Sequence, residues 1–183
     1  MNTLLVIDMQ NAWLNETPRH DAPAIIERIN RACSSIRATN GKVVFIRNCS
    51  EDCPAGTQGW EIIPELSVMP EDVIFEKYAC DSFADTFLLT HLQEIGCKTL
   101  YMCGLATEFC VDTTLRGALS RGFNVIALKD AHTTGNRPHL SAQQIIEHHN
   151  WVWSNMAAPF GRTLRVCNTE QALTDLDQTA SLP

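Results

Sequence analysis

Residues 99–128 read TLYMCGLATEFCVDTTLRGALSRGFNVIAL and place a strand, a helix and a second strand in succession. The apolar run at residues 99–103 stops at Gly104, as a buried strand does. Residues 108–121 have helical periodicity, and residues 124–128 form the next apolar run. Two strands joined through a helix lie parallel with a right-handed crossover, so this segment predicts one βαβ unit.

The same alternation extends over the rest of the chain. Further strands are predicted at four apolar runs, residues 4–7, 42–47, 73–75 and 163–166. Further helices are predicted at three periodic segments, residues 21–39, 84–95 and 141–156, while residues 48–72 read as irregular. Strands that alternate with helices predict an α/β fold with a parallel sheet, and the 183 residues suit a single domain spanning residues 1–183.

The composition narrows the class of protein. The formal net charge is -7, which argues against a nucleic-acid binder because such a protein needs a basic surface. No apolar run approaches the roughly 18 residues of a membrane span. The eight cysteines follow no secretory signal, so free thiols in a reducing compartment are predicted. We therefore expect a cytoplasmic protein that binds a small molecule, with neither nucleic acid nor membrane as a partner.

Several reactive side chains follow predicted strands. Ligands of parallel sheets bind at the carboxyl ends of the strands, so Asp8, Lys77, Cys110 and Asp130 are expected at one edge. Cys110 falls in the first turn of the helix predicted at residues 108–121, where free N–H groups and the helix dipole favour a thiolate. The same N–H groups could stabilise an oxyanion. The alternative is a buried helix cysteine without chemistry.

Asp8 and Lys77 could assist such a thiol. Asp8 ends an apolar strand and could accept the thiol proton, although a helix cap or a sheet-edge ion pair is the alternative. The Lys77 ammonium could lower the thiol pKa, although a solvated surface lysine is the alternative. No histidine is placed beside Cys110, and His132 after the fifth strand could line the site.

Five segments, taken in order, resemble the isochorismatase-like cysteine hydrolases, a family that includes nicotinamidases, N-carbamoylsarcosine amidase and ureidoacrylate amidohydrolase. They are LLVIDMQN at residues 4–11, GTQGWEIIPEL at 56–66, EK at 76–77 with DSF at 81–83, GLATEFCV at 104–111 with Thr114 and Ala118 downstream, and DA at 130–131. The resemblance covers roughly residues 3–167.

The resemblance implies a Rossmann-like, three-layer α-β-α sandwich around a six-stranded, mostly parallel sheet. It implies a catalytic triad of Asp8, Lys77 and Cys110. It also implies a cis peptide between Leu105 and Ala106, which would aim the N–H groups of Ala106 and Cys110 at a substrate carbonyl as an oxyanion hole. The implied reaction is cleavage of an amide-type or ureide-type C–N bond through a thioester on Cys110.

Two departures from the family pattern matter. Nicotinamidases carry an Asp-x-His metal cluster after the second strand, and residues 48–60 contain no histidine, so neither metal nor other cofactor is predicted. Isochorismatases that cleave a vinyl ether can lack the cysteine, so Cys110 favours attack on a carbonyl. Vinyl ether hydrolysis and a non-catalytic binding role stay open as alternatives. Family members form dimers, tetramers or larger assemblies, so a homodimer or homotetramer is expected.

The substrate pocket is predicted from loop positions after the strands. Trp13 and Trp60 could supply apolar or stacking walls, with loop packing or a subunit contact as the alternative. The predicted substrate-binding residues are Gln10, Trp13, Trp60, Tyr78, Thr107 and His132.

Overall fold

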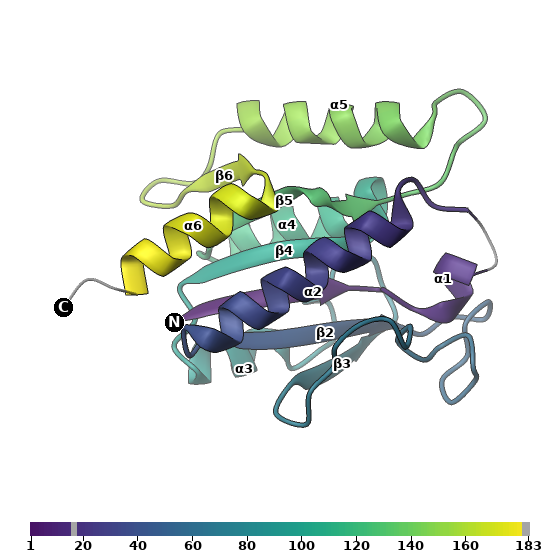
Figure 1. The fold of residues 1–183 in the computed structure, drawn as a ribbon, viewed down its shortest axis with the longest axis horizontal. Coiled ribbons are helices and arrows are strands. Elements are labelled where there is room, and N and C mark those ends of the chain that lie inside the picture. The colour runs from purple at the N-terminus through teal and green to yellow at the C-terminus, as the bar shows by residue number, and fades with distance from the viewer. Residues whose placement is uncertain (16–17, 181–183) are drawn as a thin grey trace.

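The computed structural model describes residues 1–15 and 18–180, and its centre is a six-stranded sheet (Figure 1). Within these residues the strands are β1 (Asn2–Ile7), β2 (Lys42–Asn48), β3 (Val73–Lys77), β4 (Thr99–Leu105), β5 (Asn124–Thr133) and β6 (Leu164–Cys167). Their order is β3-β2-β1-β4-β5-β6, and every neighbouring pair is parallel. The predicted α/β fold is confirmed, and the sheet is wholly rather than mostly parallel.

Helices cover both faces of this sheet. They are α1 (Asn11–Asn15), α2 (Ala22–Ala38), α3 (Leu88–Glu94), the π-helix η1 (Thr107–Val111), α4 (Asp112–Ser120), α5 (Ala142–Asn155) and α6 (Thr169–Ala180). In the described part of the chain, no helix is both long and apolar enough to cross a membrane. Neither α1 nor α6 was predicted from the sequence, although Ala172, Leu173 and Leu176 of α6 are spaced as on one face of a helix.

The helix predicted at residues 84–95 begins later than expected, at Leu88. The preceding residues form a turn that satisfies its own polar groups, because the Phe83 N–H donates to Asp81 and the Thr86 hydroxyl donates to the Ser82 carbonyl. Local side-chain bonds of this kind compete with helix formation. The periodicity of the apolar residues therefore placed the helix correctly but not its start.

Alternation along β1 produces the two cores. Leu4 and Val6 pack with α2 and α6, whereas Leu5 and Ile7 pack with α3 and α4 on the opposite face. In Figure 1, α2 and α6 lie in front of the sheet, and α3 and α4 lie behind it. Continuous apolar strands are expected where both faces of a parallel sheet are covered, and the fold is the predicted three-layer sandwich.

The strand order reverses between β1 and β4. The chain runs outward from β1 through β2 to β3 and then returns to place β4 beside β1. At this point the backbones come very close, because a Cβ on Gly104 would lie 2.1 Å from the Ile7 carbonyl oxygen. Gly104 also has a φ of 116°, which disfavours any side chain. The loops that leave β1 and β4 diverge here, which is where open α/β sheets bind ligands.

Candidate active site

Three residues from distant parts of the sequence meet at this reversal point. Asp8 follows β1, Lys77 ends β3, and Cys110 lies in η1. The Lys77 Nζ lies 2.7 Å from Asp8 Oδ2 and 3.1 Å from Cys110 Sγ. Lys77 and Asp8 are buried, and Cys110 is half-buried. The structure therefore brings together the three side chains that the sequence singled out for chemistry.

Lys77 is held in place by further acceptors. Its ammonium donates to the Ala79 carbonyl at 3.1 Å and to Asn48 Oδ1 at 3.4 Å. Burial lowers the pKa of Lys77, but the charge of Asp8 and the contact with Cys110 outweigh burial and leave the pKa raised. These contacts hold the Lys77 side chain in place and favour its charged ammonium form.

The charge states of Asp8 and Cys110 follow from burial. Burial raises the pKa of Asp8, and the nearby Lys77 ammonium only partly offsets that rise. Burial also raises the pKa of Cys110 well above its usual range, with a further rise from the Asp8 charge that exceeds the opposing effect of Lys77. Burial and the Asp8 charge therefore favour the neutral thiol, which opposes the thiolate-favouring effect expected from the helix start.

Asp8 is arranged as a proton acceptor. It follows β1 with a φ of 50°, a conformation that is uncommon for residues other than glycine. Its Oδ2 faces Lys77, whereas its Oδ1 is buried without a hydrogen-bond partner among the described residues. The Cys110 thiol interacts with the same carboxyl group. A buried carboxylate oxygen with spare acceptor capacity next to a thiol can take the thiol proton.

A cavity of about 320 Å³ opens onto these groups. Its walls combine the reactive residues with apolar side chains and two arginines: Asp8, Trp13, Arg19, Asn48, Cys80, Leu105, Ala106, Phe109, Cys110 and Arg137. Trp13 lies in this wall, as predicted. The peptide between Leu105 and Ala106 is cis, as the resemblance implied. Ala106 and Cys110, the two predicted oxyanion-hole residues, line the same cavity as Asp8.

Comparison with known proteins assigns the chain to a family. Residues 2–171 match the family model for the isochorismatase domain. The chain belongs to the isochorismatase family. A solved isochorismatase family protein is 31% identical, has a TM-score of 0.81, and covers 89% of this chain while this chain covers 97% of it.

Curated relatives of this isochorismatase-family chain include hydrolases. A streptothricin hydrolase of Streptomyces noursei is 34% identical over 143 residues, which are 75% of this chain and 56% of that protein. The chain thus spans little more than half the length of this relative. A ureidoacrylate amidohydrolase of Methylorubrum extorquens is 27% identical over 198 aligned positions, which cover 85% of this chain and 79% of that protein.

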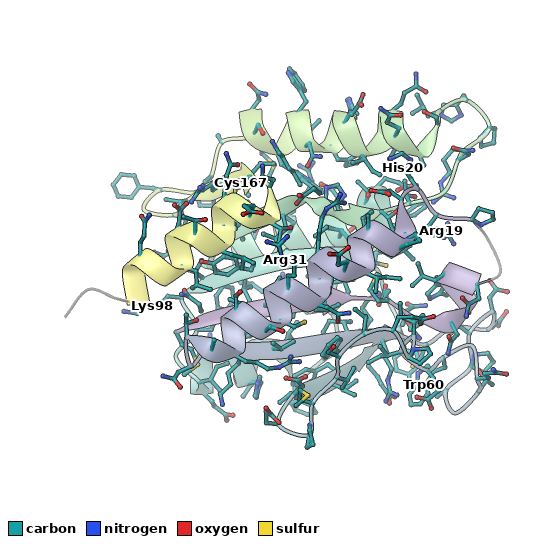
Figure 2. The ribbon with its side chains drawn as sticks, viewed as in Figure 1. Arg19, His20, Arg31, Trp60, Lys98 and Cys167 are labelled. Carbon is teal, nitrogen blue, oxygen red and sulfur yellow. The ribbon has the colours of Figure 1, made fainter. Side chains whose placement is uncertain are left out.

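Two predicted substrate-binding residues instead hold a loop. Gln10 is fully buried and donates to the carbonyls of Asn48 and Trp60 at 3.0 and 2.9 Å, while its own Oε1 accepts from the Asn48 N–H. The Trp60 indole donates to Cys49 Sγ, and the Arg47 guanidinium lies 3.3 Å from its ring centroid. Figure 2 labels Trp60, which lies on the loop between β2 and β3. Neither Gln10 nor Trp60 lines the cavity. Both predictions are corrected because these side chains are used for packing.

Tyr78 is also outside the cavity. It directly follows Lys77, just after the end of β3. Tyr78 is 78% exposed and lines a separate hollow with Cys49 and Pro54. The prediction that Tyr78 binds substrate in the cavity is therefore not supported within the described chain.

Thr107 and His132 form a buried link behind the cavity rather than part of its wall. Thr107 Oγ1 lies 2.8 Å from His132 Nδ1, and His132 Nε2 lies 3.1 Å from Asn150 Oδ1. Because the Asn150 amide nitrogen donates to the Lys129 carbonyl, its oxygen accepts from His132 Nε2 and His132 Nδ1 accepts from Thr107. Burial lowers the pKa of His132 to about 4. The neutral ring therefore joins η1 to β5 and α5, which corrects its predicted role.

Asp130 has a structural role on the face of the sheet that α2 and α6 cover. Its Oδ1 accepts from both the N–H and the hydroxyl of Thr169 at 2.8 Å, where α6 begins. Its Oδ2 lies 3.7 Å from Arg28 of α2. Asp130 does not line the cavity, so its expected place beside Cys110 is corrected.

Sequence reasoning missed two arginines of the cavity wall. Arg19 precedes α2, and Figure 2 shows it beside the amino-terminal end of that helix. Arg137 follows β5. The available signal for Arg137 was its position after a strand, on the edge where ligands of parallel sheets bind. Arg19 carries no such signal, because it reaches the cavity from the loop between α1 and α2.

No metal site emerges from the described side chains. Among them, no three His, Cys, Asp or Glu residues are grouped so that they could hold a metal ion. The absence of a metal from the working protein stays a prediction.

Proposed function

We propose that this isochorismatase-family protein is a cysteine hydrolase that cleaves an amide-type or ureide-type C–N bond of a small molecule through a thioester. The observation that supports this most is the Lys77 ammonium, which contacts Asp8 at 2.7 Å and Cys110 at 3.1 Å, two residues that line a cavity. Two relatives whose names describe hydrolysis, a streptothricin hydrolase and a ureidoacrylate amidohydrolase, support the same reaction class.

The proposed reaction begins with proton transfer inside the site. Asp8 accepts the Cys110 proton as the sulfur attacks the substrate carbonyl, and the Lys77 ammonium stabilises the negative charge that develops. The carbonyl oxygen becomes an oxyanion, which the N–H groups of Ala106 and Cys110 would bind. Asp8 then returns the proton to the departing nitrogen, the C–N bond breaks, and a thioester remains on Cys110.

Water completes the proposed cycle. Asp8, again a carboxylate, takes a proton from a water molecule that attacks the thioester carbonyl. The C–S bond then breaks, the acid product forms, and the proton returns to the sulfur. A raised thiol pKa suits this cycle, because a high-pKa sulfur needs a positioned base and Asp8 is that base.

We also propose that the enzyme works in the cytoplasm and as a homodimer or homotetramer, as the sequence predicts. No disulfide joins any of the described cysteines, which is compatible with a reducing compartment. Light scattering coupled to size exclusion tests the assembly, and a monomer at working concentration would contradict it.

The test of the function is ammonia or amine release from a panel of small amides, ureides and carbamoyl compounds. Wild type is expected to turn over at least one member, and Cys110→Ala is expected to lose about 10³-fold or more of that activity. Cys97→Ser is the matched control, because Cys97 is a half-buried thiol outside the cavity.

Two outcomes would overturn the proposal. Cys110→Ala with wild-type amide turnover would remove the nucleophile. Pyruvate release from isochorismate that survives Cys110→Ala, without any amide turnover, would favour vinyl ether hydrolysis instead.

A further inference from the structure

The cavity that holds the reactive thiol also has an unusual arrangement of charges in its wall. Arg137 donates through Nε to Glu108 Oε1 at 2.6 Å, and its Nη2 lies 2.6 Å from the same oxygen. Arg19, the second arginine of the wall, donates its Nε to the Trp13 carbonyl at 2.5 Å. Among the described residues, no carboxylate forms an ion pair with Arg19. The guanidiniums of Arg19 and Arg137 therefore lie near a single carboxylate, that of Glu108.

The surplus positive charge is not neutralised by the catalytic residues. Asp8 and Lys77 form a closed ion pair, so together they carry no net charge in the resting site. Burial and the positive charge of Arg137 lower the pKa of Arg19, and the Glu108 carboxylate opposes this only in part. Arg19 therefore lies half-desolvated beside a like charge, an arrangement that a bound anion would stabilise.

The lack of a side chain at Gly135 leaves room for the Arg19 guanidinium. A Cβ on Gly135 would lie 2.8 Å from Arg19 Nη1, so any larger residue at 135 would displace the guanidinium. The apolar part of the wall comes from Trp13, Leu105 and Phe109, and Arg137 lies over the Phe109 ring with Cζ 5.2 Å from its centroid. The cavity thus has a nucleophile, apolar walls and a cationic region.

We propose that Arg19 and Arg137 form a carboxylate-binding subsite, so that the substrate is a small amide or ureide that also carries a carboxylate. A guanidinium presents parallel N–H donors that match the two oxygens of a carboxylate. This inference rests on the proposed function for the words amide and ureide. The anion subsite itself is a property of the cavity and can be tested without turnover.

The probe pair is iodoacetate and iodoacetamide, which have nearly the same shape but differ in charge. Both alkylate a thiol, forming a C–S bond and releasing iodide, and the rate at Cys110 is followed by mass spectrometry of its peptide at pH 9. The measured quantity is the ratio of the iodoacetate rate to the iodoacetamide rate. We expect Arg19→Gln to lower this ratio about fivefold, because one attractive unit charge at the cavity is lost.

Three variants sharpen this test. Arg19→Lys keeps the charge and is expected to keep the ratio within about twofold of wild type. Arg137→Gln is expected to lower the ratio as Arg19→Gln does. Arg31→Gln is the matched control, because Arg31 is half-exposed on α2, pairs with Glu170 and lies outside the cavity. Raising the salt concentration to about 1 M should shrink the wild-type preference, since salt screens exposed charges.

The possible results separate this inference from the proposed function. A ratio that is unchanged in both Arg19→Gln and Arg137→Gln overturns the anion subsite, even if the enzyme hydrolyses amides. A ratio that falls supports the subsite, even if no amide on the panel is cleaved. Where turnover is found, Arg19→Gln should raise KM for an amide acid about fivefold and leave its methyl ester unchanged, and equal effects on both would also overturn the subsite.

Discussion

Two charged clusters face the same cavity and differ in burial and balance. Asp8, Lys77 and Cys110 are deep in the site, and the Lys77 side chain is completely buried. Arg137 of the cavity wall and its ion-pair partner Glu108 form the other cluster, with 31% and 15% of their side chains exposed. The buried cluster has one ammonium for one carboxylate. The wall cluster, with Arg19 next to it, has more positive than negative charge.

This difference in burial and charge balance indicates that the two clusters have different functions. Charges taken out of water are costly unless each is paired, so the buried cluster must stay balanced and rigid while a proton moves within it. Charges near water are cheaper to leave unbalanced and keep part of their attraction for a ligand. The buried cluster suits bond making and breaking, and the wall cluster suits recognition.

The largest expected effect comes from breaking the buried pair. Lys77→Met leaves the Asp8 carboxylate buried without its cation, so the free energy of unfolding should fall by about 3–5 kcal/mol and amide turnover should be lost. Urea unfolding followed by circular dichroism measures the first effect. Lys129→Met is the control, since Lys129 is exposed. A loss below about 1 kcal/mol would show that the pair is solvated, and the contrast between the clusters would fail.

A second prediction concerns the resting charge of the thiol. Burial and Asp8 raise the pKa of Cys110, so the thiolate fraction should rise about tenfold per pH unit over the whole range below that pKa. The rate of iodoacetamide alkylation at Cys110 should therefore still be climbing at pH 9. A plateau near pH 7 would mean a preformed thiolate and would contradict the assignment of Asp8 as a necessary base.

The pH dependence of turnover gives the matching prediction for Asp8. Asp8 must be a carboxylate to accept the proton, and burial raises its pKa above the ordinary value of 3.8. The specificity constant kcat/KM should fall about tenfold per unit as pH drops through that raised pKa. If kcat/KM begins to fall only at or below the ordinary aspartate pKa, the group whose protonation stops the reaction is not the buried Asp8.

The smallest effect is expected at the cavity wall. Arg19→Gln removes a charge without an ion-pair partner among the described residues, so the free energy of unfolding should change by less than about 1 kcal/mol. The same urea experiment as for Lys77→Met measures this. A loss as large as that of Lys77→Met would assign Arg19 to the structural framework rather than to recognition.

The sequence could predict the buried cluster because one rule determines it. Asp8 and Lys77 each stand at the end of an apolar strand, Cys110 follows one after a short connection, and parallel strands bring such positions to one edge. The same rule misplaced Asp130, because β5 continues to Thr133 beyond the apolar run. The ladder between β4 and β5 shifts register between Met102 and Gly104, and the sequence carries no visible signal for such a bulge.

The wall cluster could not be predicted in the same way. Arg19 and Arg137 reach the cavity from loops, and a loop's path depends on packing rather than on periodicity. Gln10 illustrates the opposite error. It lies two residues from Asp8, yet its side chain bonds the loop carrying Trp60 rather than facing the cavity. Proximity in sequence therefore indicated the region of the site but not the direction of each side chain.

The most direct test of the central claim is the mass of the enzyme during turnover. An amide that wild type hydrolyses would be mixed with the enzyme, quenched in acid within milliseconds to seconds, and measured by intact and peptide mass spectrometry. We predict an acyl group on the Cys110 peptide that hydroxylamine removes and that is absent from Cys110→Ala. Turnover by wild type with no acyl group on Cys110 under single-turnover conditions, or an acyl group on another residue, would contradict the proposed thioester.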